Sequence, residues 1–387
     1  MEYTIGLVSS EFFREDLGGF GGYGSLCKYI AERYNKEKYS QFKFKMFLMN
    51  THPRKRLIAH NTKVFPLQNK LPPIKLAEYK KRINQEHIDI FLTVDLYPRY
   101  LYSLLAKPNT PTIVWLQDPR TKYDWKKIAT SPFIYKNESK NIDTKTRDIS
   151  YKITYKLIQK TRKIRFATQA HFLGRKGALK FGTREALNAS FLPNPITIPS
   201  RVKFSEKNNK PTILFLGRLD PVKRPWIFFE IAKLLPKYEF WVAGKSHNYE
   251  YMRDRIIPYK SLKNLKFLGS VFGKTKDRIL RKSWILVNTS IHEALPVSFL
   301  EALSYKIPII SCQNPDNLVS QFGEYVGEIY GDGYESAPLF AQAIKNLVED
   351  ESLLKNLGNK GRQYAKKYHT FERFEKEMRR LIDSIIQ

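Results

Sequence analysis

Two glutamates with seven residues between them, Glu293 and Glu301, lie in the stretch SIHEALPVSFLEALSYKIPII at residues 290–310. Pro296, between them, favours the first turn of a helix, where the amide hydrogen that proline lacks would have no partner. Free amides at a helix N-terminus attract phosphate, and those expected here belong to Leu295, Val297 and Ser298. Glu293 would then lie beside a sugar hydroxyl, and Glu301 could accept hydrogen bonds from a ribose diol. The alternative is one acidic residue that answers the helix dipole and one exposed glutamate.

A glycine followed by two cations forms a second candidate site, in the stretch LFLGRLDPVKRP at residues 214–225. An apolar strand is expected to end at Gly217, which lets the backbone approach a ligand closely. Arg218 and Lys223 follow in a tight turn, and two cations suit a diphosphate. A turn with solvated basic residues is the alternative.

Two stretches in the N-terminal half also follow expected strands. GGFGGYG at residues 18–24 permits close backbone approach at Gly21 and Gly22, although it lacks the Lys-Ser/Thr ending of a nucleotide P-loop. In WLQDPRT, Gln117 and Asp118 follow an apolar run, and Asp118 could orient an acceptor hydroxyl or cap a turn before proline. Ligands of open α/β sheets bind at the carboxyl ends of strands, so all four stretches lie where a site is expected.

Short apolar runs alternate with longer helical patterns along the chain. This alternation predicts parallel sheets covered by helices. The expected strands of the first half are YTIGLVS, FKFKMFLM, IDIFLTV, TIVWLQ and FATQAHFL. Those of the second half are TILFLGRL, YEFWVAG, LKFLGSV, SWILVNTS and IPIISC. Because the pattern restarts once, the expected fold class is α/β with two Rossmann-like domains.

A join rich in proline and polar residues, LPNPITIPSRVKFSEKNNKP at residues 192–211, separates the two halves. The expected domains are residues 1–195 and residues 196–370. Residues 371–387 form a third segment, an amphipathic helix that must cover an apolar surface. Its apolar stripe consists of Phe371, Phe374, Met378, Leu381, Ile382 and Ile385.

The chain of 387 residues carries 67 Lys and Arg against 37 Asp and Glu, a formal net charge of +30. This excess favours an anionic partner such as nucleic acid, a membrane surface or a phosphorylated ligand, or else reflects compositional bias.

The only cysteines, Cys27 and Cys312, have no metal-ligand pattern near them, which argues against a disulfide framework and a zinc site. The start, MEYTIGLVSS, is expected to be a strand rather than a signal peptide. No uncharged apolar run approaches the roughly 18–20 residues of a transmembrane helix.

Four stretches, GRLDPVKRP, WVAG, LKFLGSV and HEALPVSFLEALSYKIPII, together resemble the second domain of the retaining glycosyltransferases of family 4. The resemblance covers most of residues 211–330 and extends more weakly to the glycine loop and to LPNPI. The spacing of Glu293 and Glu301 matches the E-x7-E motif of that family. The resemblance implies the GT-B fold, in which two Rossmann-like domains face each other across a cleft and the last helix crosses back to the N-terminal domain.

The resemblance also implies a role for each candidate residue. The catalytic set is Glu293, near the reacting end of the donor sugar, with two cations that neutralise the diphosphate leaving group, Arg218 and Lys223. The donor-binding set is Glu301, which holds the ribose, together with Gly217, Ser270, Val271, Leu295, Pro296, Val297 and Ser298. The acceptor or cleft set is Gly21, Gly22, Gln117 and Asp118. Gln117 stands where many relatives have histidine.

The expected function is transfer of a hexose-type sugar, with retention of configuration, from a UDP- or GDP-linked donor to a hydroxyl acceptor. Cell-surface polysaccharide, glycolipid or glycoconjugate synthesis would use such a step. No D-x-D sequence occurs, so neither a metal nor another cofactor is expected. A nucleotide-sugar epimerase, or a phosphorylase, for which no pyridoxal lysine motif is apparent, is the enzymatic alternative. A basic nucleic-acid-binding protein is the alternative from another class, but no helix-turn-helix, zinc or RNP-type motif supports it, and no nucleic-acid partner is expected.

Lysines at helical spacing predict a basic helix face within SYKITYKLIQKTRKIRF, and they are Lys152, Lys156, Lys160 and Lys163. Three neighbours are suited to a membrane interface, namely Tyr151, Tyr155 and Ile158. We therefore expect an anionic membrane surface as a partner and a lipid-linked acceptor. The expected location is cytoplasmic, peripheral on the inner face of the membrane. A solvated helix face is the alternative.

Overall fold

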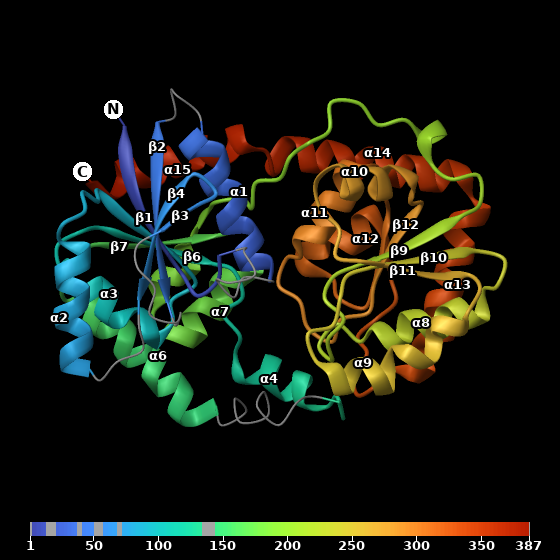
Figure 1. Cartoon of the computed structure of the whole chain (residues 1–387), viewed down its shortest axis with the longest axis horizontal. Coiled ribbons are helices and arrows are strands. Elements are labelled where there is room, and N and C mark those ends of the chain that lie inside the picture. The colour runs from blue at the N-terminus through green and yellow to red at the C-terminus, as the bar shows by residue number, and fades with distance from the viewer. Residues whose placement is uncertain are drawn as a thin grey trace. The chain divides into compact units, whose positions relative to one another are not determined.

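The structure is a computed structural model that describes residues 2–12, 21–36, 41–49, 57–67, 72–133 and 144–386. The chain divides into two compact units (Figure 1). Unit 1 consists of residues 1–121, 143–195 and 371–387, and unit 2 consists of residues 122–142 and 196–370. The sequence-based division placed residues 122–142 in the N-terminal domain. The described part of this segment, residues 122–133, groups instead with unit 2, because Trp125 and Ile128 of helix α4 (Lys122–Ala129) pack on Ile291 of that unit.

Unit 1 is built on an eight-stranded sheet in the order β3-β4-β2-β1-β5-β6-β7-β8. Neighbouring strands are parallel except β3, which runs antiparallel to β4. The strands are β1 Tyr3–Ser9, β2 Phe42–Met49, β3 Leu57–Ala59, β4 Thr62–Leu67, β5 Ile90–Val94, β6 Thr112–Leu116, β7 Ile164–Thr168 and β8 Ser190–Phe191. The helices are α1 Gly22–Lys36, α2 Pro72–Ile83, α3 Leu101–Leu105, α6 Thr144–Gln159, α7 Phe172–Phe181 and α15 Phe371–Ile386.

One expected strand of unit 1, FATQAHFL, is shorter in the structure than its apolar run. Strand β7 ends at Thr168, and helix α7 begins at Phe172. The hydroxyl of Thr168 donates to the carbonyl of Ala170 at 2.6 Å, which turns the chain out of the sheet. Strands β3, β4 and β8 were not expected from the sequence.

The C-terminal helix α15 belongs to the core of unit 1, as its apolar stripe predicts (Figure 1). The ring of Phe374 lies 5.6 Å from that of Trp115 on β6, and the hydroxyl of Tyr34 on α1 donates to the carbonyl of Phe371 at 3.0 Å. The other α15 side chains buried in this core are Met378, Leu381, Ile382 and Ile385. The first unit is therefore completed by the last helix of the chain.

Unit 2 is built on a six-stranded parallel sheet in the order β11-β10-β9-β12-β13-β14. The strands are β9 Thr212–Leu216, β10 Glu239–Ala243, β11 Leu265–Gly269, β12 Ile285–Asn288, β13 Ile309–Ser311 and β14 Gly323–Tyr325. Besides α4, the helices are α8 Pro225–Leu234, α9 Tyr249–Arg255, α10 Gly273–Lys282, α11 Val297–Ser304, α12 Leu318–Phe322, α13 Ala337–Glu349 and α14 Glu351–Tyr368. Among the described residues, no helix has the combination of length and apolar character needed to cross a membrane.

A buried lysine lies in the segment that leads into β9. The amine of Lys207 donates to the carbonyl of Ser283 at 2.5 Å, and the side chain is almost fully buried. Burial, followed by the charge of Lys306, lowers the pKa of Lys207 to about 7. An unfolded lysine keeps its proton up to about pH 10. The unfolded state therefore binds the extra proton between pH 7 and 10, and the free energy of unfolding rises with pH across that range.

Replacement of Lys207 with methionine is expected to stabilise the protein, most strongly at low pH. Methionine fills the site without a charge, so Lys207→Met gains about 2–4 kcal/mol at pH 6, and this gain shrinks as the pH approaches 10. Calorimetric melting temperatures of the wild type and the variant at pH 6 and pH 9.5 measure the effect. An equal difference at both pH values would show that Lys207 keeps its ordinary pKa.

Candidate active site

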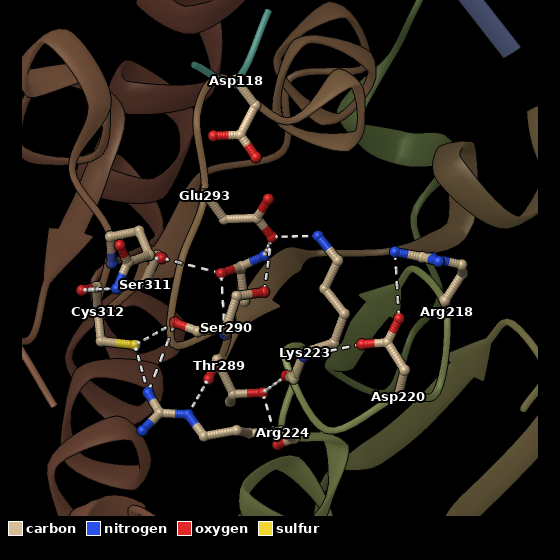
Figure 2. Close-up of polar contacts among 12 residues, drawn as sticks. Asp118, Arg218, Asp220, Lys223, Arg224, Thr289, Ser290, Glu293, Ser311 and Cys312 are labelled. Carbon is tan, nitrogen blue, oxygen red and sulfur yellow. Dashed lines mark hydrogen bonds and ion pairs between the residues drawn. The ribbon is translucent and has the colours of Figure 1, made fainter. Parts of the chain in front are cut away.

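The candidate residues of unit 2 lie at the edge of the sheet where its parallel strands end. Gly217 follows β9, Gly244 follows β10 and Asn288 ends β12. This is the edge at which open α/β sheets bind ligands. Figure 2 shows the side chains that gather there.

Two glycines bring the ends of β9 and β10 into close contact. The amide of Gly217 donates to the carbonyl of Ala243 at 3.0 Å. A Cβ atom on Gly244 would lie 1.8 Å from the carbonyl oxygen of Gly217, so only glycine fits there. The close approach of Gly244 thus fixes the position of Gly217, the residue at which the turn with Arg218 and Lys223 begins.

An aspartate organises the turn after Gly217. Asp220 accepts a hydrogen bond from the backbone amide of Lys223 at 3.1 Å and forms an ion pair with Arg218 at 3.2 Å. Figure 2 shows the Arg218 guanidinium turned toward Asp220. Arg218 remains 48% exposed, so it is accessible to a ligand.

The catalytic candidates Lys223 and Glu293 form an ion pair. The Lys223 amine lies 2.5 Å from Oε1 of Glu293 and points directly at it (Figure 2). Burial alone would raise the pKa of Glu293, but the Lys223 charge and hydrogen bonds from Lys223, Ser290 and Asn288 outweigh burial and lower it. Glu293 is therefore an anion held in a largely buried position.

Polar residues at the end of β12, which the sequence analysis missed, fix the carboxylate of Glu293. Its Oε1 accepts hydrogen bonds from Ser290 Oγ at 2.6 Å and from Asn288 Nδ2 at 3.0 Å. Asn288 is itself oriented, because its Oδ1 accepts from the Ser290 amide at 3.2 Å and from the Ser311 hydroxyl at 3.3 Å. Their position at the carboxyl end of the expected strand SWILVNTS was the only available signal in the sequence.

Arg224, which the sequence analysis also missed, supports the turn that carries Arg218 and Lys223. Its side chain is fully buried, and its guanidinium donates to the carbonyls of Thr289 at 2.9 Å and Ile329 at 3.1 Å and to Cys312 Sγ at 3.3 Å. The Thr289 hydroxyl in turn donates to the carbonyl of Lys223 at 2.9 Å. Arg224 thus joins the turn to the end of β12 (Figure 2). An arginine beside other basic residues gave no sign in the sequence that it is buried.

Helix α11 begins one residue later than the sequence analysis expected. Pro296 precedes the helix with extended backbone, and Val297 is the first helical residue. Leu295 therefore lies outside the helix, and its amide does not belong to the helix N-terminus. The amides of Val297 and Ser298 lie in the first turn, where they have no acceptor within the helix.

Glu301, in the second turn of α11, forms an ion pair that the sequence analysis did not foresee. Its Oε1 lies 2.5 Å from the amine of Lys276 on α10. Between β11 and α10 the chain bends at Gly269 (φ 66°) and Gly273 (φ 52°). This bend contains Ser270, which is exposed, and Val271, whose side chain is buried.

The glycine loop of unit 1 lies partly outside the described residues, which begin again at Gly21. Gly22 is the first residue of α1. A Cβ atom on Gly21 would lie 2.3 Å from Oε2 of Glu11, and the same oxygen accepts a hydrogen bond from the amide of Gly24 at 3.3 Å. The carboxylate of Glu11 thus lies against the first turn of α1 and accepts a hydrogen bond from it.

Gln117 is not available for the acceptor contact expected of it. Its side chain is buried, and its amide exchanges hydrogen bonds with that of Asn194 at 2.9 and 3.1 Å. Asp118 is only partly buried, and its carboxylate lies 2.7 Å from Nε of Arg120. Asp118 therefore remains a candidate for orienting an acceptor hydroxyl, whereas Gln117 does not.

A buried aspartate that the sequence analysis missed orients Asp118. Asp95 follows β5 in the left-handed region (φ 54°), and its carboxylate accepts from the amides of Gln117 at 2.7 Å and Asp118 at 3.0 Å and from the Tyr23 hydroxyl at 2.7 Å. Burial raises the pKa of Asp95 to about 6. Its position after the apolar run IFLTV was the signal that could have identified it.

The two units, each with a mainly parallel sheet covered by helices, belong to the GT-B fold class. Among solved structures, Anabaena Alr3699/HepE in complex with UDP and glucose aligns over 99% of this chain and 100% of its own, with a TM-score of 0.70 and 14% identity. The lipopolysaccharide outer core galactosyltransferase WaaB aligns over 98% and 99%, with a TM-score of 0.62 and 15% identity. At such identities the likeness concerns the fold.

The match to a sequence family concerns unit 2. Residues 198–364, which include every candidate catalytic and donor-binding residue, match the family described as glycosyl transferases group 1. The UDP-Gal:alpha-D-GlcNAc-diphosphoundecaprenol alpha-1,3-galactosyltransferase of Escherichia coli is 30% identical over 40% of this chain and 41% of its own length. The amylovoran biosynthesis glycosyltransferase AmsD of Erwinia amylovora is 25% identical over 43% and 46%. Each match thus spans less than half of the relative.

Proposed function

We propose that this protein is a retaining glycosyltransferase that moves a hexose-type sugar from a nucleoside diphosphate sugar to a hydroxyl acceptor. The observation that carries the proposal is the Lys223–Glu293 ion pair at the carboxyl edge of the sheet, just before the N-terminus of α11. We propose that the lysine of this pair offsets the charge of a phosphate leaving group and that the carboxylate contacts the sugar. The family match over residues 198–364 contains both residues and supports the proposal.

The arrangement suits the charge that develops during transfer. The bond between the anomeric carbon and the diphosphate oxygen breaks, and the diphosphate leaves with the electron pair. Lys223 and Arg218 offset this negative charge, together with the free amides of Val297 and Ser298. We propose no resident metal, because these cations supply the positive charge that a metal would provide. Activity that persists in the presence of a chelator is the expected result.

The ion pair also suggests how the donor is received. Without a ligand, Lys223 is neutralised by Glu293. An incoming diphosphate competes for Lys223 and releases Glu293, whose carboxylate stays in place through Ser290 and Asn288. Glu293 then accepts hydrogen bonds from the hydroxyls of the sugar. Glu301, whose Oε1 contacts Lys276 in the absence of a ligand, accepts hydrogen bonds from the ribose.

The comparisons suggest the classes of donor and acceptor. We propose a UDP- or GDP-linked donor, and the complex of the Anabaena protein with UDP and glucose makes UDP the first nucleotide to try. The name of the E. coli relative describes a lipid-linked sugar as acceptor, alpha-D-GlcNAc-diphosphoundecaprenol, and the name of AmsD refers to amylovoran biosynthesis. We therefore propose a lipid-linked acceptor in cell-surface polysaccharide or glycolipid synthesis. We also propose that the enzyme works in the cytoplasm, peripheral on the inner face of the membrane, because such an acceptor would be reached there.

UDP or GDP is expected to stabilise the protein against unfolding. At about 100-fold excess over its dissociation constant, a ligand that binds only the native state adds about 2.7 kcal/mol. Melting temperatures with UDP, GDP and the corresponding nucleosides measure the effect, and the nucleosides should stabilise less because they lack the diphosphate. Stabilisation by nucleosides and diphosphates alike would contradict the diphosphate site.

Sugar transfer itself is tested with radiolabelled nucleotide sugars and a membrane lipid extract as the source of acceptor. The proposal expects labelled lipid only when the extract is present, with the anomeric configuration of the donor retained in the product. Conversion of the nucleotide sugar into another nucleotide sugar without acceptor would favour an epimerase instead.

A further inference from the structure

We infer that helix α6 docks onto an anionic membrane surface through two parallel stripes of side chains on its exposed side. The apolar stripe has a spacing of four residues and consists of Ile149, Ile153 and Leu157, which are 57%, 51% and 40% exposed. The basic stripe has the same spacing and consists of the exposed residues Lys152, Lys156 and Lys160, the last just beyond the helix. These six residues are called the α6 face.

The α6 face is opposite the side of the helix that packs in unit 1. At about 100° per residue, each stripe spans about 80° around the helix axis, and the two stripes adjoin. The side chains expected at the membrane, Tyr151, Tyr155 and Ile158, are instead buried. The Tyr155 hydroxyl donates to Glu185 at 2.7 Å, and its ring packs 5.6 Å from that of Phe166. The apolar residues of the membrane face are therefore different from those first expected.

The lysines of the α6 face are not neutralised within the described part of the chain, where none of the three forms an ion pair. Residues 149–163 contain no Asp or Glu. The first acidic residue on either side of this stretch has another partner, since Asp148 pairs with Lys180 at 3.1 Å and Glu185 accepts from Tyr155 and Gln159. The positive charge of the face is thus free to act on an external anionic surface.

An anionic bilayer fits both stripes at once. The lysine amines can reach lipid phosphates while the three aliphatic side chains enter the boundary of the acyl chains. The polyphosphate backbone of a nucleic acid would leave the aliphatic stripe without a contact. A protein partner fits less well, because the α6 face lacks the aromatic and arginine side chains that dominate protein interfaces. The neighbouring Arg162 is not part of it, because its buried guanidinium donates to the carbonyls of Thr110 and Lys107.

The inference extends the proposed function, because a lipid-linked acceptor would be found at such a surface. Only this biological purpose rests on the proposed function. Binding to vesicles is measured without donor or acceptor, so its outcome is independent of whether sugar transfer occurs. Failure of vesicle binding and failure of sugar transfer are therefore distinguishable.

The first test is co-sedimentation of the full chain with vesicles of phosphatidylglycerol and phosphatidylcholine, or of phosphatidylcholine alone. We expect binding to the anionic vesicles, weakened by salt. Each lysine near such a surface contributes about fivefold to binding. Reversal of the three charges, by Lys152→Glu, Lys156→Glu and Lys160→Glu together, should therefore reduce binding by about 100-fold or more. The matched control reverses three exposed lysines of unit 2, Lys237, Lys345 and Lys360, and should keep substantially more binding.

The second test asks whether the aliphatic stripe enters the bilayer. Both natural cysteines, Cys27 and Cys312, are buried, so a surface cysteine can be labelled selectively. An environment-sensitive fluorophore at Ile153→Cys should shift to the blue with anionic vesicles, whereas one at Leu339→Cys, an exposed site in unit 2, should not. Replacing Ile149, Ile153 and Leu157 with glutamine should leave the melting temperature unchanged and weaken binding.

Three outcomes would overturn the inference. The first is binding that ignores lipid charge, and the second is an equal loss in the two triple-lysine variants. The third is a lysine-dependent binding of RNA without any binding to vesicles, which would assign the face to nucleic acid.

Discussion

Replacing Lys223 with alanine lowers the rate of sugar transfer by about 10²–10³-fold, the usual cost of removing one group that stabilises charge in the transition state. The Lys223 amine is held at the end of β12 through Glu293, and its backbone is held by Asp220 and Thr289. The diphosphate takes the place of Glu293 at this amine when the donor binds, and the held backbone keeps the cation beside the leaving group. Arg218→Ala should have a similar or smaller effect, because the Arg218 side chain is more exposed. Steady-state kinetics with the donor identified by thermal stabilisation measure both.

Loss of activity in Lys223→Ala has a second source that the experiment must separate. The change leaves the buried Glu293 carboxylate without its cation, which destabilises the protein. The double variant Lys223→Ala, Glu293→Gln removes both charges and should recover thermal stability but not activity. Lys237→Ala, an exposed lysine of the same unit, is the matched control. If Lys223→Ala and Arg218→Ala both retain activity within twofold of the wild type, the diphosphate assignment is wrong.

The two glutamates are expected to separate transfer from nucleotide binding. Glu293→Gln should lower transfer by at least about 10²-fold and leave UDP binding unchanged or tighter, because the carboxylate competes with the diphosphate for Lys223. Glu301→Ala should weaken UDP binding by about tenfold or more, the contribution of a hydrogen bond to a charged group. Calorimetric titration with UDP and transfer assays on the same preparations provide the comparison.

Exposed Glu349→Gln serves as the control for both glutamates. A reversal, in which Glu293→Gln weakens UDP binding and Glu301→Ala does not, would exchange the two roles. Unchanged transfer in Glu293→Gln would remove Glu293 from the catalytic set.

Most of the fold could be predicted from local patterns, because most strands carry their own apolar run, although β4 was missed. Strands β1 and β2 have the bounds of the expected runs, and the stripe on α15 predicts a helix with one buried side. The short strands β3, β8 and β14 were missed, since two or three residues make no recognisable pattern. The start of α11 was wrong by one residue, because proline is compatible both with the position before a helix and with its first turn.

The partners of the site residues could not be predicted, because they come from segments that are distant in the sequence. Lys223 lies 70 residues from Glu293, and Gln117 lies 77 residues from Asn194. A glutamine after a strand has the same local pattern whether it faces a ligand or another amide. Arg224 and Asp95 are buried charges, which composition and spacing alone do not distinguish from exposed ones.

The place of α15 in the core of unit 1 has a consequence for the synthesis of the protein. Domains generally fold as units while the ribosome is still adding residues. Here Phe374 and Met378 reach their positions beside the strands of unit 1 only after all of unit 2 has been translated. Until then, the surface of unit 1 that α15 covers is exposed to solvent in the nascent chain. Chaperones would have to protect this surface during that period. An early translation stop before Phe371 would leave that surface open permanently.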